Sequence, residues 1–229
     1  MTALRAVCFD LDGTLFDHRG AARTGVVAFI ERLGLRPTDA AVDAWFAAED
    51  EQYERWRSRQ ISFQEQRRAR LRTVLPALGH PVPTSDDGLD ALFDEYLQGY
   101  RTSWRLFPGT LSLLQDLRSR GFRLGLLTNG SEEQQRDKLA RTGLDTAFDA
   151  VCISEAIGVQ KPDARAFLTV ARALDVDPAA CLFVGDDVAR DIVGARAAGM
   201  RALLVDHDVP GSADIRTVVL GAVDAAAMP

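Results

Sequence analysis

The chain has 229 residues, 47% of them hydrophobic and 26% charged, and its formal net charge is −6. This balance excludes a disordered chain, and the length suits one domain or one domain with an insertion. The acidic charge argues against nucleic acid or an anionic membrane as the main partner, because both attract basic surfaces.

The sequence also indicates where the protein works. It has no run long enough for a membrane span and no signal-peptide pattern at its start. Its three cysteines are an odd number without C-x-x-C spacing, which is typical of buried, reduced thiols in a cytosolic protein. We therefore expect a cytoplasmic protein that does not associate with membranes. The cysteines are Cys8, Cys152 and Cys181.

A short apolar run at residues 4–9 predicts a buried strand. The following segment, from about residue 19 to residue 103, has helical patterns only. Ser62-Phe63-Gln64-Glu65 matches a capping box and marks the start of one of these helices. We expect a compact bundle of four helices. The predicted helices cover residues 20–33, 38–59, 62 to about 79, and 86 to about 103.

The rest of the chain alternates between helices and strands, which predicts a parallel sheet covered on both faces. The first strand has no partner nearby in sequence, so we expect it to join this later sheet. The fold class is then α/β, with a Rossmann-like, three-layer α/β/α core (residues 1–17 and 104–229) and an inserted all-α four-helix cap (residues 18–103). The predicted helices lie near 110–120, 132–142, 163–174 and 188–198, and the strands at 122–127, 149–153, 181–185 and 201–205.

Polar residues follow four predicted strands, at the sheet edge where open parallel sheets bind ligands. Several carboxylates in one place repel one another unless a cation is present, and an all-oxygen set favours Mg²⁺. Hydroxyl, amide and ammonium groups at the same edge suit a phosphoryl group. Each fragment alone also fits a turn or a helix start, but four in this order favour a site. The residues are Asp10, Asp12, Thr128, Asn129, Lys161, Asp186, Asp187 and Asp191.

These fragments resemble the four motifs of the haloacid dehalogenase superfamily of hydrolases, in the group with a helical cap inserted after the first strand. The resemblance covers residues 1–17 and 104–206, and no motif is visible in the cap. The matching segments are Phe9-Asp10-Leu11-Asp12-Gly13-Thr14-Leu15, Leu126-Leu127-Thr128-Asn129-Gly130, Gly158-Val159-Gln160-Lys161-Pro162-Asp163, and Val184-Gly185-Asp186-Asp187 continuing through Asp191 to Met200.

The resemblance implies a Mg²⁺-dependent phosphomonoester hydrolase in which Asp10 forms an aspartyl-phosphate and Asp12 is the general acid and base. It implies a metal held by the Asp10 carboxylate, the Asp12 backbone carbonyl and Asp186. We expect a small phosphorylated metabolite, such as a nucleotide or a sugar phosphate, as substrate, and a monomer or homodimer. The remaining roles are phosphate binding by Thr128, Asn129 and Lys161, metal contact through water by Asp187, and orientation of Lys161 by Asp191.

Three alternatives stay open. A phosphomutase similar to beta-phosphoglucomutase shares these motifs. A 2-haloacid dehalogenase is expected to lack Asp12 and the full acidic set, and a non-catalytic binding protein is expected to have lost Asp10 or Lys161.

Residues of the cap would select the substrate, with hinges at residues 15–20 and 102–108. Aromatic residues at helical spacing are more often core than ligand contacts, and the many arginines of the cap are typical of a solvated face. The candidates are Trp45, Tyr53, Trp56, Arg57 and, at the hinge, His18, Arg19 and Trp104.

Overall fold

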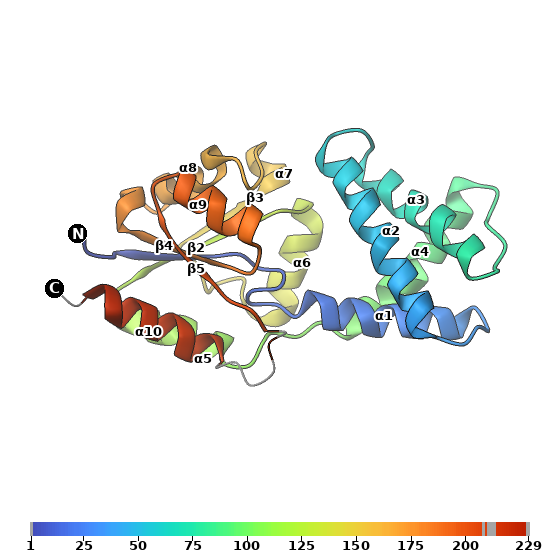
Figure 1. The fold of residues 1–229 in the computed structure, drawn as a ribbon, viewed down its shortest axis with the longest axis horizontal. Helices are drawn as coiled ribbons and strands as arrows, with labels where there is room; N and C mark the ends of the chain where they lie inside the picture. Colours follow the sequence, from blue (N-terminus) through green and yellow to red (C-terminus); the bar gives the residue numbers. More distant parts are fainter. Residues whose placement is uncertain (1, 208, 210–213, 228–229) are drawn as a thin grey trace. The chain divides into compact units, whose positions relative to one another are not determined.

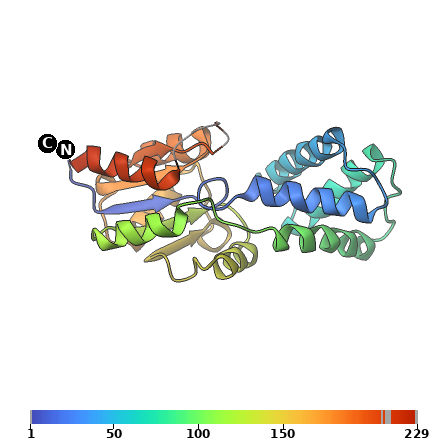
Figure 2. The same ribbon diagram turned by 90° about the horizontal axis from the view of Figure 1, so that it is seen from below.

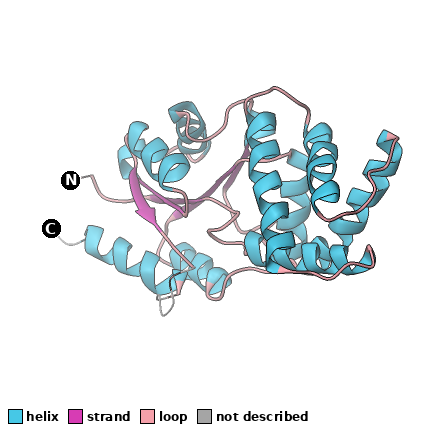
Figure 3. Ribbon diagram, turned by 45° about the vertical axis from the view of Figure 1, so that its right-hand side comes forward, coloured by secondary structure: helices cyan, strands magenta, loops and turns pink. Residues whose placement is uncertain are grey.

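The computed structural model describes residues 2–207, 209 and 214–227 (Figure 1). It divides into two compact units, one drawn from Met1–His18 and Arg105–Pro229 and the other from Arg19–Trp104. The described strands all belong to the first unit, whereas the second is built of helices (Figure 3).

The first unit contains a parallel sheet of five strands in the order β3-β2-β1-β4-β5. The first strand pairs with β2 on one side and β4 on the other, so the central strand comes from the start of the chain. Every residue of this strand is fully buried, as its apolar sequence predicts. The strands are β1 (Ala6–Phe9), β2 (Arg123–Thr128), β3 (Ala150–Ile153), β4 (Cys181–Gly185) and β5 (Arg201–Leu204).

Helices cover both faces of the sheet, which confirms the predicted α/β class. One face carries α5 (Thr110–Ser119) and α10 (Ile215–Ala227), which lie side by side (Figure 2). The other carries α8 (Ala164–Ala173) and α9 (Gly194–Ala197) (Figure 1). From β1 the chain adds β2 and then β3 on one side, and it later adds β4 and then β5 on the other side of β1. The strand order therefore reverses between β1 and β4. Open sheets of this kind bind ligands at such a topological switch point, beyond the carboxyl ends of the strands.

The shorter elements include α6 (Glu132–Thr142), α7 (Ser154–Ile157) and a 3₁₀ turn at Pro178–Ala180. All three cysteines lie in strands, and they are free and buried. The alanine-rich tail, for which the sequence supported no prediction, forms α10; residues 210–213 and 228–229 lie outside the described residues.

The predicted helix at 188–198 begins differently from the expectation. Val188–Val193 is a π-helix, and an α-helix starts only at Gly194. The amide of Ile192 donates to the carbonyl of Asp187, five residues earlier. Apolar periodicity does not distinguish such a widened turn from an ordinary one, and widened turns are frequent at functional sites. This one carries Asp191 into the interior, where it is fully buried.

The helical unit contains α2 (Asp39–Arg57), α3 (Phe63–Ala77) and α4 (Asp86–Thr102), together with α1 (His18–Arg32), whose first residue belongs to the other unit. Ser62 caps α3 by accepting from the amide of Glu65 at 3.0 Å, which confirms the predicted start. Trp45 is fully buried, and its ring centroid lies 4.4 Å from that of Tyr96. Trp45 is therefore part of the core of this unit. None of the helices described has both the length and the apolar character to cross a membrane.

Ion pairs formed by the arginines of α3 link this helix to α4. The Arg68 guanidinium donates to both carboxylate oxygens of Asp90, at 2.7 and 2.6 Å, and to Asp86 at 2.7 Å. The hydrogen bonds from Arg68 to Asp90 lower the pKa of Asp90 from 3.8 to about 2. A carboxylate with a lowered folded-state pKa stabilises the fold above its unfolded pKa, and this contribution disappears as the pH falls from about 4 to about 2.

We therefore expect Asp90→Asn to lower the melting temperature by a few degrees at neutral pH and to leave it nearly unchanged at about pH 2. Melting curves of both proteins across this range measure the difference. Asp94→Asn, an exposed residue on the same helix, is the matched control. A deficit of Asp90→Asn that is independent of pH would contradict the ion-pair origin of the effect.

Candidate active site

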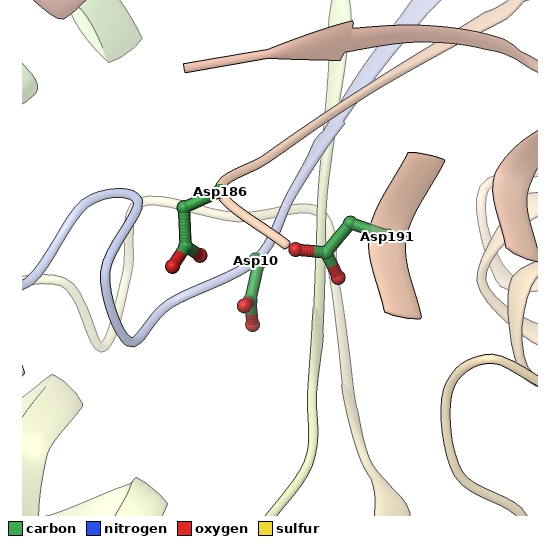
Figure 4. A group of neighbouring side chains, drawn as sticks. All are labelled: Asp10, Asp186 and Asp191. Atoms are coloured by element: carbon green, nitrogen blue, oxygen red, sulfur yellow. The ribbon is translucent and has the colours of Figure 1, made fainter. Parts of the chain in front are cut away.

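Three carboxylates converge beyond the ends of β1 and β4. Asp10 follows β1, Asp186 follows β4, and Asp191 comes from the π-helix (Figure 4). One oxygen of each lies within 4.8 Å of the others. Asp10 and Asp191 are buried, whereas Asp186 is exposed. Solvent therefore reaches this acidic group mainly at Asp186.

Lys161 is the cation of this group. Its ammonium nitrogen lies 2.7 Å from Asp10 Oδ1 and 2.7 Å from Asp191 Oδ1, and its side chain is 3% exposed. Asn129 holds the lysine backbone from both sides: Nδ2 donates to the Lys161 carbonyl at 3.0 Å, and Oδ1 accepts from its amide at 2.9 Å. This contact differs from the phosphate contact that the sequence suggested for Asn129. The amide side chain ties the end of β2 to the turn that carries Lys161 and so fixes the position of the lysine backbone.

The electrostatics of the group call for a further cation. Burial raises the pKa of Asp10, and although Lys161 opposes this, Asp191 and Asp186 raise it further. Burial and Asp191 also raise the pKa of Asp186. Burial disfavours the charged form of Lys161, but Asp10 and Asp191 outweigh it and raise its pKa, so the lysine stays protonated. One ammonium for three carboxylates leaves excess negative charge, and an all-oxygen donor set of this kind suits Mg²⁺.

Two glycines make room for these carboxylates. A Cβ on Gly13 would lie 2.2 Å from Asp186 Oδ2, and the φ of this residue is +85°, a conformation that favours glycine. A Cβ on Gly185 would lie 2.3 Å from Asp191 Oδ2. The Thr14 hydroxyl then donates to Asp186 Oδ1 at 3.0 Å. Glycine at these two positions of the first and fourth motifs therefore allows the side chains of Asp186 and Asp191 to lie close to the backbone.

The Asp187 carboxylate lies apart from this group, although its backbone amide donates to Asp191 Oδ2 at 3.1 Å. Its Oδ1 accepts from the backbone amide of Arg190 at 2.7 Å, and its Oδ2 accepts from the guanidinium Nε at 2.6 Å. Burial tends to raise the pKa of Asp187, but these hydrogen bonds outweigh it and lower the value. The structure thus brings Asp191, and not Asp187, into the acidic group and uses Asp187 to cap the π-helix.

Asp12 is held by two residues of α6 that the sequence reasoning missed. Lys138 Nζ lies 2.6 Å from Asp12 Oδ1, and Gln135 Nε2 donates to Asp12 Oδ2 at 3.0 Å and to the Thr128 hydroxyl at 2.6 Å. His18 Nδ1 lies 4.0 Å from Asp12 Oδ1. Burial opposes the charged form of Asp12, yet Lys138 and then His18 outweigh it and lower its pKa.

Composition contained a signal for Lys138. The chain has 27 basic residues, and only two of them, Lys138 and Lys161, are lysines. Both are almost fully buried, and each pairs with one carboxylate of the Asp10-Leu11-Asp12 segment. The other 25 of these 27 residues are arginines. Lysine therefore occurs in this chain only where a compact ammonium contacts an acidic residue of the site.

A parallel sheet with a buried lysine and converging carboxylates at its carboxyl edge defines an α/β enzyme suited to phosphoryl transfer. The family model for haloacid dehalogenase-like hydrolases matches residues 4–199. The chain belongs to that family, and its similarity to two phosphatases, described next, makes it a phosphatase-type member.

Similar proteins support this assignment. The chain is 33% identical to a glyceraldehyde 3-phosphate phosphatase of Methanothermobacter thermautotrophicus, over 90% of this chain and 87% of the relative. It is 31% identical to a ribulose-1,5-bisphosphate 5-phosphatase of Halopiger xanaduensis, over 91% and 89%. Its fold is shared by the magnesium-bound HAD-hydrolase YfnB of Bacillus subtilis, with a TM-score of 0.78, 22% identity and 91% coverage of both chains.

Proposed function

We propose that this phosphatase is a Mg²⁺-dependent phosphomonoester hydrolase that works through an aspartyl-phosphate on Asp10. The supporting observation is the way in which Asp10 is held. Its Oδ1 accepts from the amide of Leu11 at 2.7 Å and pairs with Lys161 at 2.7 Å. Neither contact uses Oδ2. One oxygen is anchored, and the other is left for reaction with phosphorus.

In the first step, an oxygen of Asp10 forms a bond to phosphorus while the bond from phosphorus to the ester oxygen breaks. Asp12 gives a proton to the departing oxygen, which leaves as an alcohol. Lys138 favours the ionised form of Asp12 before substrate enters, and the negative phosphoryl group then favours transfer of a proton from solvent water to Asp12, which is the proton that the departing oxygen receives. In the second step, water attacks phosphorus, Asp12 takes its proton, and the bond between phosphorus and Asp10 breaks to release inorganic phosphate.

The remaining residues bind and orient the phosphoryl group. The Thr128 hydroxyl and the Lys161 ammonium would donate to its oxygens. Mg²⁺ would be held by the Asp10 carboxylate, the Asp12 backbone carbonyl and Asp186. When bound, it neutralises charge on the phosphoryl oxygens and on the crowded carboxylates. Asp191 would keep Lys161 in place, and Asp187 would keep the π-helix in place.

The substrate that we propose is a small phosphorylated metabolite. The two curated relatives are named for phosphate esters of small metabolites, glyceraldehyde 3-phosphate and ribulose 1,5-bisphosphate. Sugar phosphates are therefore favoured, and nucleotides are the other candidates. The helical unit, Arg19–Trp104, is inserted in the chain between β1 and β2. We propose that it serves as the cap that selects among these esters.

A panel of phosphate esters tests this function. We expect release of inorganic phosphate with Mg²⁺, its loss in excess EDTA, and its recovery when Mg²⁺ is restored. The panel contains glyceraldehyde 3-phosphate, ribulose 1,5-bisphosphate, hexose phosphates and nucleoside monophosphates. Transfer of phosphate to a second sugar phosphate without release would indicate a phosphomutase, and chloride release from 2-chloropropionate would indicate a dehalogenase. Either result without phosphate release would contradict the proposal.

A further inference from the structure

We propose that Lys138 and Gln135 are positioning residues that hold the Asp12 carboxylate in the place from which it exchanges protons with the ester oxygen and with water. This role rests on the proposed function and extends it to a helix face outside the four motifs. The two residues lie three positions apart on α6 and therefore project from the same side of the helix. Each is 1% exposed.

Lys138 provides the charged part of this support. Its contact with Asp12 Oδ1 is 2.6 Å long, and its ammonium also lies 5.0 Å from the centroid of the buried Phe16 ring. Burying an ammonium in an apolar environment costs free energy unless a partner of opposite charge is present. The depth at which Lys138 is buried therefore indicates that its ion pair with Asp12 is important. Asp12, in contrast, keeps 26% of its side chain exposed. The carboxylate is thus fixed from the protein side and open on the other.

Gln135 fixes the second oxygen of Asp12 and also aligns Thr128. An ionised carboxylate only accepts, so the end of the amide that faces Asp12 must be Nε2. The same nitrogen donates to the Thr128 hydroxyl oxygen at 2.6 Å. Thr128 is therefore the acceptor in that bond, and its own hydroxyl hydrogen is available to a phosphoryl oxygen. One amide thus sets the direction of two groups that act on the substrate.

A glycine two positions before α6, Gly130, leaves space for this amide. A Cβ on Gly130 would lie 2.9 Å from Gln135 Cγ and 3.0 Å from its Cδ. The glycine of the second motif therefore allows Gln135 to approach the end of β2. Gly130, Gln135 and Lys138 together link the second motif to the acid–base residue of the first.

The test compares two substrates with different leaving groups. An alkyl phosphate such as glycerol phosphate needs a proton on its departing oxygen, whereas p-nitrophenyl phosphate needs little help. Because kcat/KM covers the steps up to departure of the alcohol, it reports this need directly. We expect Lys138→Met to lower kcat/KM for the alkyl ester by about ten- to a hundredfold and for the aryl ester by no more than about threefold. Arg136→Met, an exposed residue of the same helix, controls for the lost charge.

A double-mutant cycle separates positioning from a structural role. If Lys138 acts through Asp12, Asp12→Asn combined with Lys138→Met should be no slower than Asp12→Asn alone. Losses that are equal for both esters, or that multiply in the double variant, would overturn the proposal. If Lys138→Met does not fold, Lys138→Gln gives the same comparison, because it removes the ammonium charge and leaves the contact between Gln135 and Thr128 in place. The proposed function fails separately, if the wild-type enzyme releases no inorganic phosphate or forms no aspartyl-phosphate on Asp10.

Discussion

Asp10→Asn should reduce phosphate release by at least about 10³-fold while the protein keeps its fold. The amide is nearly isosteric with the carboxylate, but it is a poor nucleophile and cannot form the aspartyl-phosphate. Asp10 is buried, at 8% exposed, and lies beside two further carboxylates. A neutral side chain there relieves repulsion and loses one contact with Lys161, so we expect little net change in melting temperature.

Initial rates of phosphate release measure the effect, and mass spectrometry of acid-quenched wild-type enzyme should find phosphate on the peptide that contains Asp10. Circular dichroism and melting curves check the fold. Asp145→Asn, an exposed residue in a turn, makes the same change of charge outside the site. An activity of Asp10→Asn within about tenfold of the wild type, roughly 1.4 kcal/mol of barrier, would rule out Asp10 as the nucleophile.

Lys161→Met should lower the free energy of unfolding by about 3–5 kcal/mol, in addition to stopping turnover. The ammonium contacts Asp10 and Asp191 at 2.7 Å each, and Asp191 is completely buried. Its removal leaves these carboxylates without their cation, and Asp191 has no exposed surface through which water could solvate its charge. Methionine fills a similar volume, so the loss comes from charge and not from a cavity.

Urea denaturation in EDTA measures this loss without interference from bound metal. The double variant that combines Lys161→Met with Asp191→Asn is the matched comparison. It also removes the charge of Asp191, the one of the two carboxylates that is completely buried. We expect it to regain a substantial part of the stability, since replacing both members of a buried pair costs less than removing one. A single variant as stable as the wild type, or a double variant less stable than the single one, would contradict this account of the buried charges.

The amino-acid sequence by itself determined the fold class and the positions of the polar strand ends. Both depend on short-range patterns: apolar runs of strand length, helical periodicity, and turn or cap residues beside them. The α/β alternation after residue 107 and the capping box at Ser62 are local in this sense. In a parallel sheet all carboxyl ends lie at one edge, so Asp10, Thr128 and Asp186 could be assigned to one region before any packing was known.

Only the tertiary structure decided which of these polar groups contact one another. Asp191 joins the acidic group because a π-helix turns it inward, and the sequence pattern of a widened turn is that of an ordinary helix. Asn129 binds the Lys161 backbone because β2 and β3 are neighbours in the sheet.

The support of Asp12 shows the same limit of sequence reasoning. Lys138 reaches a carboxylate 126 residues away because the packing of α6 sets which side of the helix faces the site. On the sequence alone, Lys138 is one polar residue in a polar helix. Local patterns determine where elements begin and end, whereas the rotation of a helix about its axis and the pairing of buried charges depend on the whole core.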